Sequence, residues 1–385
     1  MKILHVGKYY YPYAGGMEAI VKDLCEGLCH KGHDVTVLCS HTELNTVKET
    51  INGVKIVRVP RTGVLFGQNI NPTLLNALHE LSKNVDIVHF HCPNPQAEAL
   101  ALTLPRHIPF VATYHSDVVR QKFLLNFYSP IFRKFLSRCQ KIYVPTDNHI
   151  KYSKFLPSFS EKCEIIPFGI REDSLKINEK NLIEARNFRK KYGPFALFVG
   201  RIVNYKGLDI LIDAAQKIEN RILIVGDGPE KLRLMNKVKV LGLEEKVFFL
   251  GKILDNDAFV GLYHGCEMVV LPSISPNENF GIVQLEAMAC GKPVVTTNLK
   301  SGVPCVGKKG KTCLIVEPGD SLQLASAMRM IFNNQELKKS LGTSGRARFD
   351  ENYTWKSMIE KQISSYRRTN EIHTIMIKHR KKRAA

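Results

Sequence analysis

The sequence lacks long hydrophobic runs and paired cysteines. No stretch approaches the ~18 consecutive apolar residues of a membrane-spanning helix, and the short apolar run within residues 1–7 is unlike a signal peptide. The ten cysteines are scattered without Cys-x-x-Cys pairs, which argues against a disulfide framework and against a thiolate zinc site. We therefore expect a cytoplasmic protein whose thiols are reduced.

Acidic residues are scarce as well. The sequence has 36 Asp and Glu residues against 55 Lys and Arg residues, which leaves a formal charge of +19. Such an excess suits nucleic acid, an anionic membrane surface or a phosphate-rich substrate, and composition does not choose among them. The hydrophobic content of 44% is that of a folded globular protein and excludes a disordered chain.

The length of 385 residues exceeds the roughly 250–300 at which one hydrophobic core stops growing, so two domains are expected. Short β-branched runs alternate with longer amphipathic stretches, the pattern of βαβ units and parallel sheets. We predict an α/β fold with two Rossmann-like, doubly wound domains facing each other across a cleft. The expected strands are 3–7, 34–39, 54–59, 85–91, 109–115, 141–146, 163–168, 195–200, 221–226, 247–251, 268–272, 293–297 and 312–317.

Composition also predicts the domain boundaries. Residues 1–170 form the first domain, and the charged, polar segment 171–193 is expected to be the interdomain linker. Residues 194–352 form the second domain, followed by a helix at 353–370 that is expected to pack back on the first. The basic segment 371–385 cannot pack a core and is expected to be disordered.

In sheets of this kind, ligands bind beyond the carboxyl ends of the strands, where loops lead into helices. One such loop carries Gly15 and Gly16, whose backbone amides at a helix start favour an anion, although a tight turn without a ligand is an alternative. A second loop carries Arg201 and Lys206, five residues apart. These two cations can converge on a diphosphate, or they can be ordinary solvated surface charges.

A third loop is the most informative. It carries Glu278-Asn279-Phe280-Gly281, and the helix expected from Ile282 onward carries Glu286. The two carboxylates are eight residues apart, roughly 12 Å along a helix, which is too far for the acid pair of a glycosidase. The spacing suits a long ligand held at two points, with a pair of surface acids as the alternative.

Taken together, these motifs resemble those of the family 4 retaining glycosyltransferases, in particular bacterial enzymes of surface-polysaccharide synthesis such as mannosyltransferases. The similarity extends over nearly all of residues 1–368, with the motifs in the family's order. The matching residues are Glu278 and Glu286 of an E-x7-E motif, Arg201 and Lys206 of a diphosphate site, Gly15 and Gly16 of a glycine loop, and His115 in Tyr114-His115-Ser116-Asp117.

The resemblance implies how the transferred sugar would be bound. Glu278 would bind its hydroxyls, assisted by the backbone amides of Asn279, Phe280 and Gly281. His115 would lie near the same sugar from the first domain, which is the acceptor side. The similar enzymes retain the anomeric configuration by same-face attack, in which the leaving phosphate helps to remove the acceptor proton.

The resemblance also implies how the nucleotide would be bound by the second domain. Glu286 would bind the ribose, Gly251 and Ile253 would meet the base, and Arg201 and Lys206 would neutralise the departing diphosphate, where charge develops in the transition state. No cofactor and no metal would be needed. The implied catalytic residues are Glu278, Arg201, Lys206 and His115.

Some positions depart from the family pattern or imitate other motifs. Residues 167–171 read Pro-Phe-Gly-Ile-Arg where the family has Pro-Asn-Gly-Val-Asp, and four residues rather than two separate Ser273 from Glu278. Both departures leave the preferred base and sugar open. Asp255-Asn256-Asp257 spells a metal motif of another fold, but its position predicts a helix cap. The segment 226–229 is either a plain turn or a donor contact.

The expected partners are a nucleoside diphosphate sugar, with a GDP-hexose favoured and UDP-sugars open, and a lipid-linked or glycan acceptor. Residues 117–141 hold an apolar stripe beside the cations Arg133, Lys134, Arg138 and Lys141, which suits an anionic membrane surface. An ordinary packing helix with a solvated basic side is the alternative. One alternative function is that of another enzyme with the same architecture, such as a nucleotide-sugar 2-epimerase or a phosphorylase. The other is nucleic-acid binding, which would require aromatic residues interleaved with basic ones.

Overall fold

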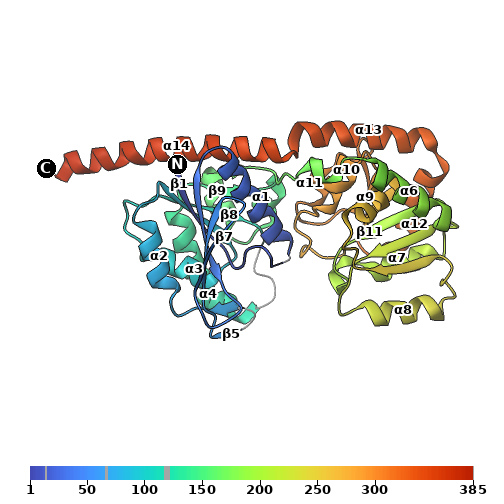
Figure 1. The fold of residues 1–385 in the computed structure, drawn as a ribbon, viewed down its shortest axis with the longest axis horizontal. Coiled ribbons are helices and arrows are strands. Elements are labelled where there is room, and N and C mark those ends of the chain that lie inside the picture. Colours follow the sequence, from blue (N-terminus) through green and yellow to red (C-terminus); the bar gives the residue numbers. More distant parts are fainter. Residues whose placement is uncertain (14, 66–67, 117–121, 385) are drawn as a thin grey trace. The chain divides into compact units, whose positions relative to one another are not determined.

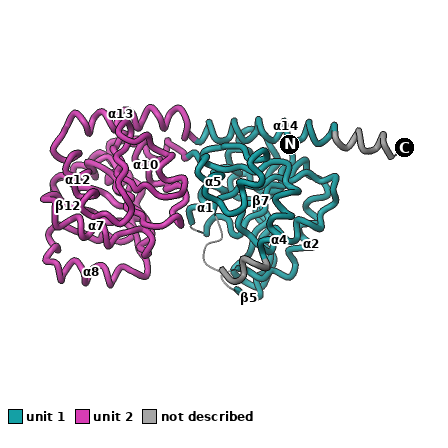
Figure 2. The backbone as a smooth tube through the Cα atoms, turned by 180° about the vertical axis from the view of Figure 1, so that it is seen from behind, with its two compact units in different colours: residues 1–169, 355–385 teal, residues 170–354 magenta. Residues whose placement is uncertain are grey.

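The computed structural model describes the backbone of residues 1–13, 15–65, 68–116 and 122–384, and their side chains except those of 122–127 and 376–384. The chain forms two compact units, one comprising residues 1–169 and 355–385 and the other residues 170–354 (Figure 2). Each unit is built on its own sheet, which is mostly parallel in the first unit and fully parallel in the second, with helices on both faces. Among the described residues, no helix is both long and apolar enough to span a bilayer.

The first unit contains an eight-stranded sheet in which only β3 runs antiparallel to its neighbour. A short hairpin of β5 (Gly63–Leu65) and β6 (Gln68–Ile70) lies outside it. In spatial order the sheet strands are β10 (Cys163–Ile165), β9 (Ile142–Val144), β8 (Phe110–Tyr114), β7 (Ile87–Cys92), β1 (Lys2–Val6), β2 (Asp34–Ser40), β4 (Val54–Val59) and β3 (Val47–Ile51).

Two sets of helices cover the faces of this sheet (Figure 1). Helices α1 (Gly16–His30) and α14 (Trp355–Ala384) bury their apolar stripes on one face. The opposite face is covered by α2 (Leu74–Ser82), α3 (Pro95–Ala101) and α4 (Lys122–Arg138). Farther along the chain are α5 (Asp147–Tyr152) and the 3-10 segment η1 (Leu156–Lys162).

The C-terminal helix lies on the first unit, beside α1, as the sequence predicts. Trp355 Nε1 donates a hydrogen bond to the Asp23 carbonyl at 2.7 Å, and a Cβ at Gly27 would lie only 2.4 Å from Ile359. The expectation of a disordered segment at 371–385 is wrong for its backbone, because α14 continues to Ala384. The physical reason is local, since no glycine or proline interrupts residues 355–384.

The second unit contains a six-stranded, fully parallel sheet. Its chain path runs from β11 outwards through β12 and β13 and then returns to the other side of β11 at β14. Such a reversal is a topological switch point, where the flanking loops diverge and leave room for a ligand. In spatial order the strands are β13 (Val247–Gly251), β12 (Arg221–Val225), β11 (Phe195–Val199), β14 (Met268–Leu271), β15 (Val294–Thr297) and β16 (Cys313–Val316).

Helices cover both faces of this sheet too. One face is packed by α7 (Leu208–Ala215), α8 (Lys231–Val240), α12 (Ser321–Asn333) and α13 (Gln335–Asn352). The other is packed by α6 (Glu179–Tyr192), α9 (Asn256–Gly265), α10 (Val283–Ala289) and α11 (Val303–Val306). The segment expected to be a linker, 171–193, therefore belongs to the second unit: it forms η2 (Glu172–Leu175) and α6, which packs closely against α9 at Gly261.

Each of the thirteen expected strands has a counterpart in the structure, with ends shifted by a few residues at most. The sequence did not predict β3, β5 or β6. These three are short, and β3 lies at the sheet edge with alternate residues exposed. Apolar runs mark buried central strands, whereas edge strands and short hairpins leave a much weaker pattern.

Candidate functional site

The second unit places an ion pair at its switch point. Lys206 ends the loop after β11, and Glu278 lies on the loop after β14, the neighbouring strand. Lys206 Nζ is 2.5 Å from Glu278 Oε2, and Ser273 Oγ donates to the same oxygen at 3.0 Å. Glu278 is only 8% exposed. The structure thus brings into direct contact two side chains for which the family resemblance implies separate roles, Lys206 for a phosphate and Glu278 for a sugar.

Glycines allow the loops at this edge to approach each other closely. Gly207 has a φ of +69°, and a Cβ there would lie 2.0 Å from the Pro272 carbonyl oxygen. Gly226 has a φ of +133°, and its Cβ would lie 1.9 Å from the Gly200 carbonyl oxygen. Both positions combine a backbone conformation that favours glycine with a contact that excludes any side chain. Lys206 can meet Glu278 because the loops after β11 and β14 are pressed together.

Arg201 differs from Lys206 in that its side chain is exposed. The next residue anchors the loop, because the Ile202 amide donates to the Asp227 carbonyl at 2.9 Å. Gly228 supports Ile202 closely, since a Cβ there would lie 2.2 Å from the Ile202 carbonyl oxygen. The segment 226–229 therefore supports the Arg201 loop from one side, which is compatible with a plain turn and with a donor contact.

Glu286 lies on α10, where Tyr263 of α9 donates a hydrogen bond to its carboxylate. Burial raises the pKa of Glu286, while the Tyr263 hydrogen bond and the charge of Lys206 act in the opposite direction. Among the described residues, Glu286 and Glu278 share no hydrogen-bond partner. They form two separate acceptor positions along one edge of the sheet.

Other predicted donor-binding residues have structural partners of their own. The Phe280 ring is buried and meets Tyr353 edge-on at 6.2 Å, so this side chain has a packing role. The Asn279 side chain donates to the Asn277 carbonyl at 3.1 Å. Gly251 and Ile253, which are predicted to meet the base, also have structural contacts. Gly251 ends β13, and its carbonyl accepts from the Gly226 amide at 2.8 Å. Ile253 packs against an apolar cluster.

Gly281 has a φ of +74°, and its Cβ would lie 2.5 Å from Leu271 of β14. The carbonyl of Gly281 accepts from the Gln284 amide at 2.9 Å, which begins the turn into α10. Gln284 then donates its side-chain amide to the carbonyls of Phe280 and Val303, at 3.0 and 3.2 Å. The loop that presents Glu278 is therefore held from both ends.

The acidic motif at 255–257 is a helix cap, as its position predicts. The Asp255 side chain accepts from the Ala258 amide at 2.7 Å at the start of α9, and Asp257 accepts from Asn178 at 3.1 Å. Among the described residues, the only group of His, Cys, Asp or Glu close enough to share an ion is His5, His89 and His91. Both nitrogens of His89 already have hydrogen-bond partners, so this group does not fit a metal site.

In the first unit, the glycine loop precedes α1. Gly15 is the N-cap, and no atom of the described residues would lie within 4 Å of a Cβ on Gly16. The loop is held from behind by the buried Arg58, which donates to the carbonyls of Tyr10, at 3.2 Å, and Tyr11. Space beside Gly16 is consistent with an approaching ligand, whereas steric need for glycine is absent there.

His115 directly follows β8 and is 6% exposed. It is joined to His91, with 3.1 Å between its Nε2 and the Nδ1 of His91, and His91 is joined in turn to His5. Burial lowers the pKa of His115 well below 6.5, so the ring is neutral. Sequence reasoning missed His5 and His91. A signal was present, because His89 and His91 alternate with apolar residues in a strand that is otherwise apolar.

Helix α4 shows the packing that we kept as the alternative to a membrane surface. Its stripe of Phe132, Phe135 and Leu136 is buried against the sheet. Arg138 is also occupied, because its guanidinium donates to four backbone carbonyls between residues 101 and 105. Arg133 and Lys134 are exposed, and Lys141 is partly buried. The remaining side chains of this prediction, 117–127, lie outside the described residues.

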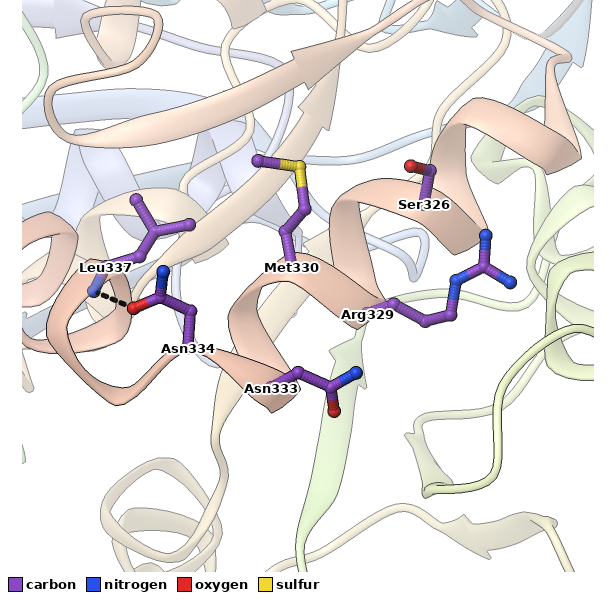
Figure 3. Close-up of a pocket in the computed structure, with 6 residues that line it drawn as sticks. All are labelled: Ser326, Arg329, Met330, Asn333, Asn334 and Leu337. Atoms are coloured by element: carbon purple, nitrogen blue, oxygen red, sulfur yellow. Dashed lines mark hydrogen bonds between the residues drawn. The ribbon is translucent and has the colours of Figure 1, made fainter.

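Only the smaller of two cavities in the structure lies beside a predicted site residue. A depression of about 310 Å³ in the second unit lies between α12 and α13 (Figure 3). Its Arg329 donates to the carbonyl of Lys217, which precedes β12, so it lies at the opposite edge of the sheet from Lys206. A cavity of about 10 Å³ beside His91 and His115 has room for no more than one water molecule.

Comparison with known proteins identifies the family. The model described as Glycosyltransferase Family 4 matches residues 14–174, and the model described as Glycosyl transferases group 1 matches residues 179–348. D-rhamnosyltransferase WbpZ of Pseudomonas aeruginosa is 31% identical over 356 residues, covering 92% of each chain. The chain belongs to the family 4 glycosyltransferases. O-antigen chain mannosyltransferase C of Escherichia coli is also similar, with 29% identity over 95% of this chain and 98% of the E. coli chain.

Solved glycosyltransferases have the same fold. Sucrose-phosphate synthase of Thermosynechococcus elongatus has a TM-score of 0.79 at 22% identity, over 95% of this chain and 98% of its own. The Anabaena protein HepE, solved in complex with UDP-glucose, has a TM-score of 0.77 at 20% identity, over 95% and 99%. This family 4 glycosyltransferase therefore has the GT-B architecture of two Rossmann-like domains.

Proposed function

We propose that this glycosyltransferase retains the anomeric configuration and transfers a hexose, with mannose favoured, from a nucleoside diphosphate sugar to a lipid-linked or glycan acceptor in cell-surface polysaccharide synthesis. The observation that carries the proposal is the Lys206–Glu278 contact of 2.5 Å at the switch point of the second sheet. A cation and a sugar-binding carboxylate side by side match the junction between a diphosphate and its sugar.

In this proposal, the leaving diphosphate is neutralised by Lys206 and the exposed Arg201. Glu278 binds hydroxyls of the sugar, and Ser273 helps to orient its carboxylate through the 3.0 Å hydrogen bond. Glu286, oriented by Tyr263, accepts hydrogen bonds from the ribose. Fixed groups that meet charge where it develops lower the barrier without reorganising at the moment of reaction.

The acceptor side is assigned to the first unit. Gly16 begins α1, and no atom of the described residues would lie within 4 Å of a Cβ there, so the loop can approach a phosphate or a hydroxyl closely. His115 presents a neutral ring at the carboxyl edge of the first sheet. No metal is required, because Arg201 and Lys206 supply the positive charge that a metal would otherwise provide.

A donor screen tests the reaction type. Purified protein is mixed with several nucleoside diphosphate sugars and an acceptor extract, and release of the nucleoside diphosphate is followed with and without exhaustive chelation. We expect release with a GDP-hexose, unchanged by chelation, and an anomeric configuration in the product equal to that in the donor. Inversion at the anomeric carbon would refute the retaining mechanism, and loss of activity restored by magnesium would refute the metal-free one.

The favoured base is guanine. The names of two relatives near 30% identity describe a mannosyltransferase and a rhamnosyltransferase, whereas a more distant fold relative is solved with UDP-glucose. Calorimetry with GDP and UDP tests the choice, with tighter binding of GDP expected. A tenfold preference for UDP would overturn it. Glu286→Ala should weaken binding of either nucleotide, and unchanged affinity would refute the ribose role.

We further propose that the enzyme acts at the inner, anionic face of the membrane. Fewer cations are available for this contact than the sequence alone suggested, because Arg138 is bound to backbone carbonyls and only Arg133 and Lys134 of this group are exposed. Each exposed cation contributes about 1 kcal/mol near an anionic leaflet. Arg133→Glu/Lys134→Glu should lose binding to anionic vesicles at low salt.

The matched control is Lys190→Glu/Lys191→Glu, which reverses two exposed charges on α6 of the second unit. This variant should still sediment with the vesicles. Equal loss of binding in both variants would show that the effect depends only on net charge. Full binding by Arg133→Glu/Lys134→Glu would remove α4 from the membrane surface.

A further inference from the structure

Three buried histidines of the first unit form a hydrogen-bonded chain that ends at the carboxyl edge of the sheet. His5 lies on β1 and His91 on β7, while His115 directly follows β8. His5 Nδ1 is 3.0 Å from His91 Nε2, and His91 Nδ1 is 3.1 Å from His115 Nε2. Because β7 lies between β1 and β8, His91 is the middle member of the chain.

The three rings are neutral. They are 0%, 1% and 6% exposed, and burial lowers the pKa of His5 to about 3 and those of His91 and His115 well below 6.5. A neutral imidazole has one N–H and one lone pair. His91, engaged at both nitrogens, therefore donates in one contact and accepts in the other. The chain of donors can run in only two directions.

The far nitrogen of His5 decides between them. His5 Nε2 is buried and has no hydrogen-bond partner among the described residues. If donation ran from His115 towards His5, this nitrogen would carry a buried N–H without an acceptor. If it ran from His5 towards His115, the same nitrogen would hold only a lone pair. Buried N–H groups without an acceptor are the rarer of the two in native proteins, so the second direction is favoured.

We propose that His91 is a positioning residue that fixes His115 in the Nδ1–H form, so that His115 offers a hydrogen-bond donor and not a base. The neighbouring His89 holds the orientation of His91, because it stacks on that ring at 4.5 Å and is itself bonded to Tyr366 at 2.5 Å and Thr113 at 2.7 Å. The inference rests on the proposed function in one respect, that His115 faces the donor sugar. There, an Nδ1–H would bind a hydroxyl or phosphate oxygen.

The tautomer can be observed directly. In protein labelled with 15N-histidine, two-bond proton–nitrogen correlations distinguish a protonated from an unprotonated ring nitrogen, and His115→Ala identifies the signals of His115 by their loss. We expect His115 to be protonated at Nδ1 and unprotonated at Nε2. The opposite assignment in the parent protein would overturn the proposal.

Two substitutions test the dependence on His91. His91→Asn keeps an amide donor near the position of Nδ1, whereas His91→Leu removes it. We expect His91→Asn to keep the Nδ1–H form and transfer within about twofold of the parent. His91→Leu should give a mixture of tautomers and a kcat about tenfold lower, with a smaller change in the donor KM. An unchanged His115 tautomer in His91→Leu would refute the proposal.

The matched control is His149→Leu. His149 is another buried histidine of the same unit, but its Nδ1 is bonded to Thr146 at 2.8 Å, outside the chain. This variant should leave the His115 tautomer unaltered. The spectra need no substrate, so they test the tautomer separately from the activity. Full transfer by His115→Ala would refute the proposed donor contact, and the parent spectrum would still decide the tautomer even if His91→Leu did not fold.

Discussion

The two units carry similar parallel sheets but treat charge differently at the carboxyl edge. In the second unit a buried carboxylate, Glu278, stays paired with Lys206. In the first, His115 and His91 are buried next to each other without a carboxylate partner among the described residues, and burial lowers both pKa values. A buried ionisable group keeps its charge when an opposite charge compensates the loss of water, and otherwise becomes neutral. The contrast fits the proposal that cations of the second unit bind the diphosphate, while His115 of the first unit offers an uncharged hydrogen-bond donor.

The largest expected difference between the units is their response to acid. In the first unit burial lowers the pKa values of five buried histidines, His5, His89, His91, His115 and His149. Below pH 6.5 the unfolded chain binds protons that these folded histidines do not, so stability falls as the pH falls. At pH 5.5 each histidine lowers the free energy of unfolding by about 1.4 kcal/mol, or on the order of 7 kcal/mol for the five.

Hydrogen exchange at pH 7.5 and 5.5, corrected for intrinsic rates, measures this difference. We expect protection in β7 to fall much more than protection in β12. In the second unit the corresponding shift is confined, among the described histidines, to His264. An equal fall in both strands would contradict the contrast between the units.

The next largest effect concerns Arg201. Its side chain is exposed, so Arg201→Ala should leave the second unit folded. The barrier to transfer should nevertheless rise by about 3–4 kcal/mol, which lowers the rate roughly 100- to 1000-fold. Arg233→Ala is the control, because that guanidinium is also solvent-exposed but pairs with Asp209 and Glu230 outside the predicted site. Steady-state kinetics measure both. Activity within a few-fold of the parent in Arg201→Ala would remove it from the diphosphate site.

Glycines of the two units should also respond differently. Gly207→Ala forces a side chain at a φ of +69° into the Pro272 carbonyl, and should lower the free energy of unfolding by about 2–3 kcal/mol. Gly242→Ala, at a φ of +64° in open space, should cost about 1 kcal/mol. Gly16→Ala should hardly change stability but should reduce transfer if the loop touches a ligand. Denaturant titration and kinetics of all three separate steric need from ligand contact, and full activity in Gly16→Ala would favour a plain turn.

The smallest expected effect concerns the helix caps. Asp255→Ala should lower the free energy of unfolding by about 1 kcal/mol and leave transfer intact. Asp320→Ala is the matched control, because Asp320 caps α12 by accepting from the amides of Leu322 and Gln323. Thermal unfolding and kinetics measure both variants. If Asp255→Ala alone abolished transfer, and magnesium dependence were found in the parent, the motif at 255–257 would be a metal site after all.

Much of the fold could be predicted because its signals are local. Buried central strands read as apolar runs, and the loops after β11 and β14 carry glycines where the backbone requires them, as at Gly207 and Gly281. The order of the motifs along the chain was sufficient to identify the family. The linker at 171–193 was mispredicted for a local reason as well, since a polar helix such as α6 can pack on one narrow side while the rest stays charged.

By itself, the sequence determined the thirteen main strands, the family and the residue types along the site loops. Only the tertiary structure decided which of them meet. Three kinds of contact join segments that are distant in sequence. They are the ion pair of Lys206 with Glu278, the hydrogen bonds of His91 with His5 and His115, and the hydrogen bonds of Arg138 to backbone carbonyls. Such contacts depend on the order of strands in each sheet, which residue periodicity does not encode, because periodicity reports only which side of an element is buried.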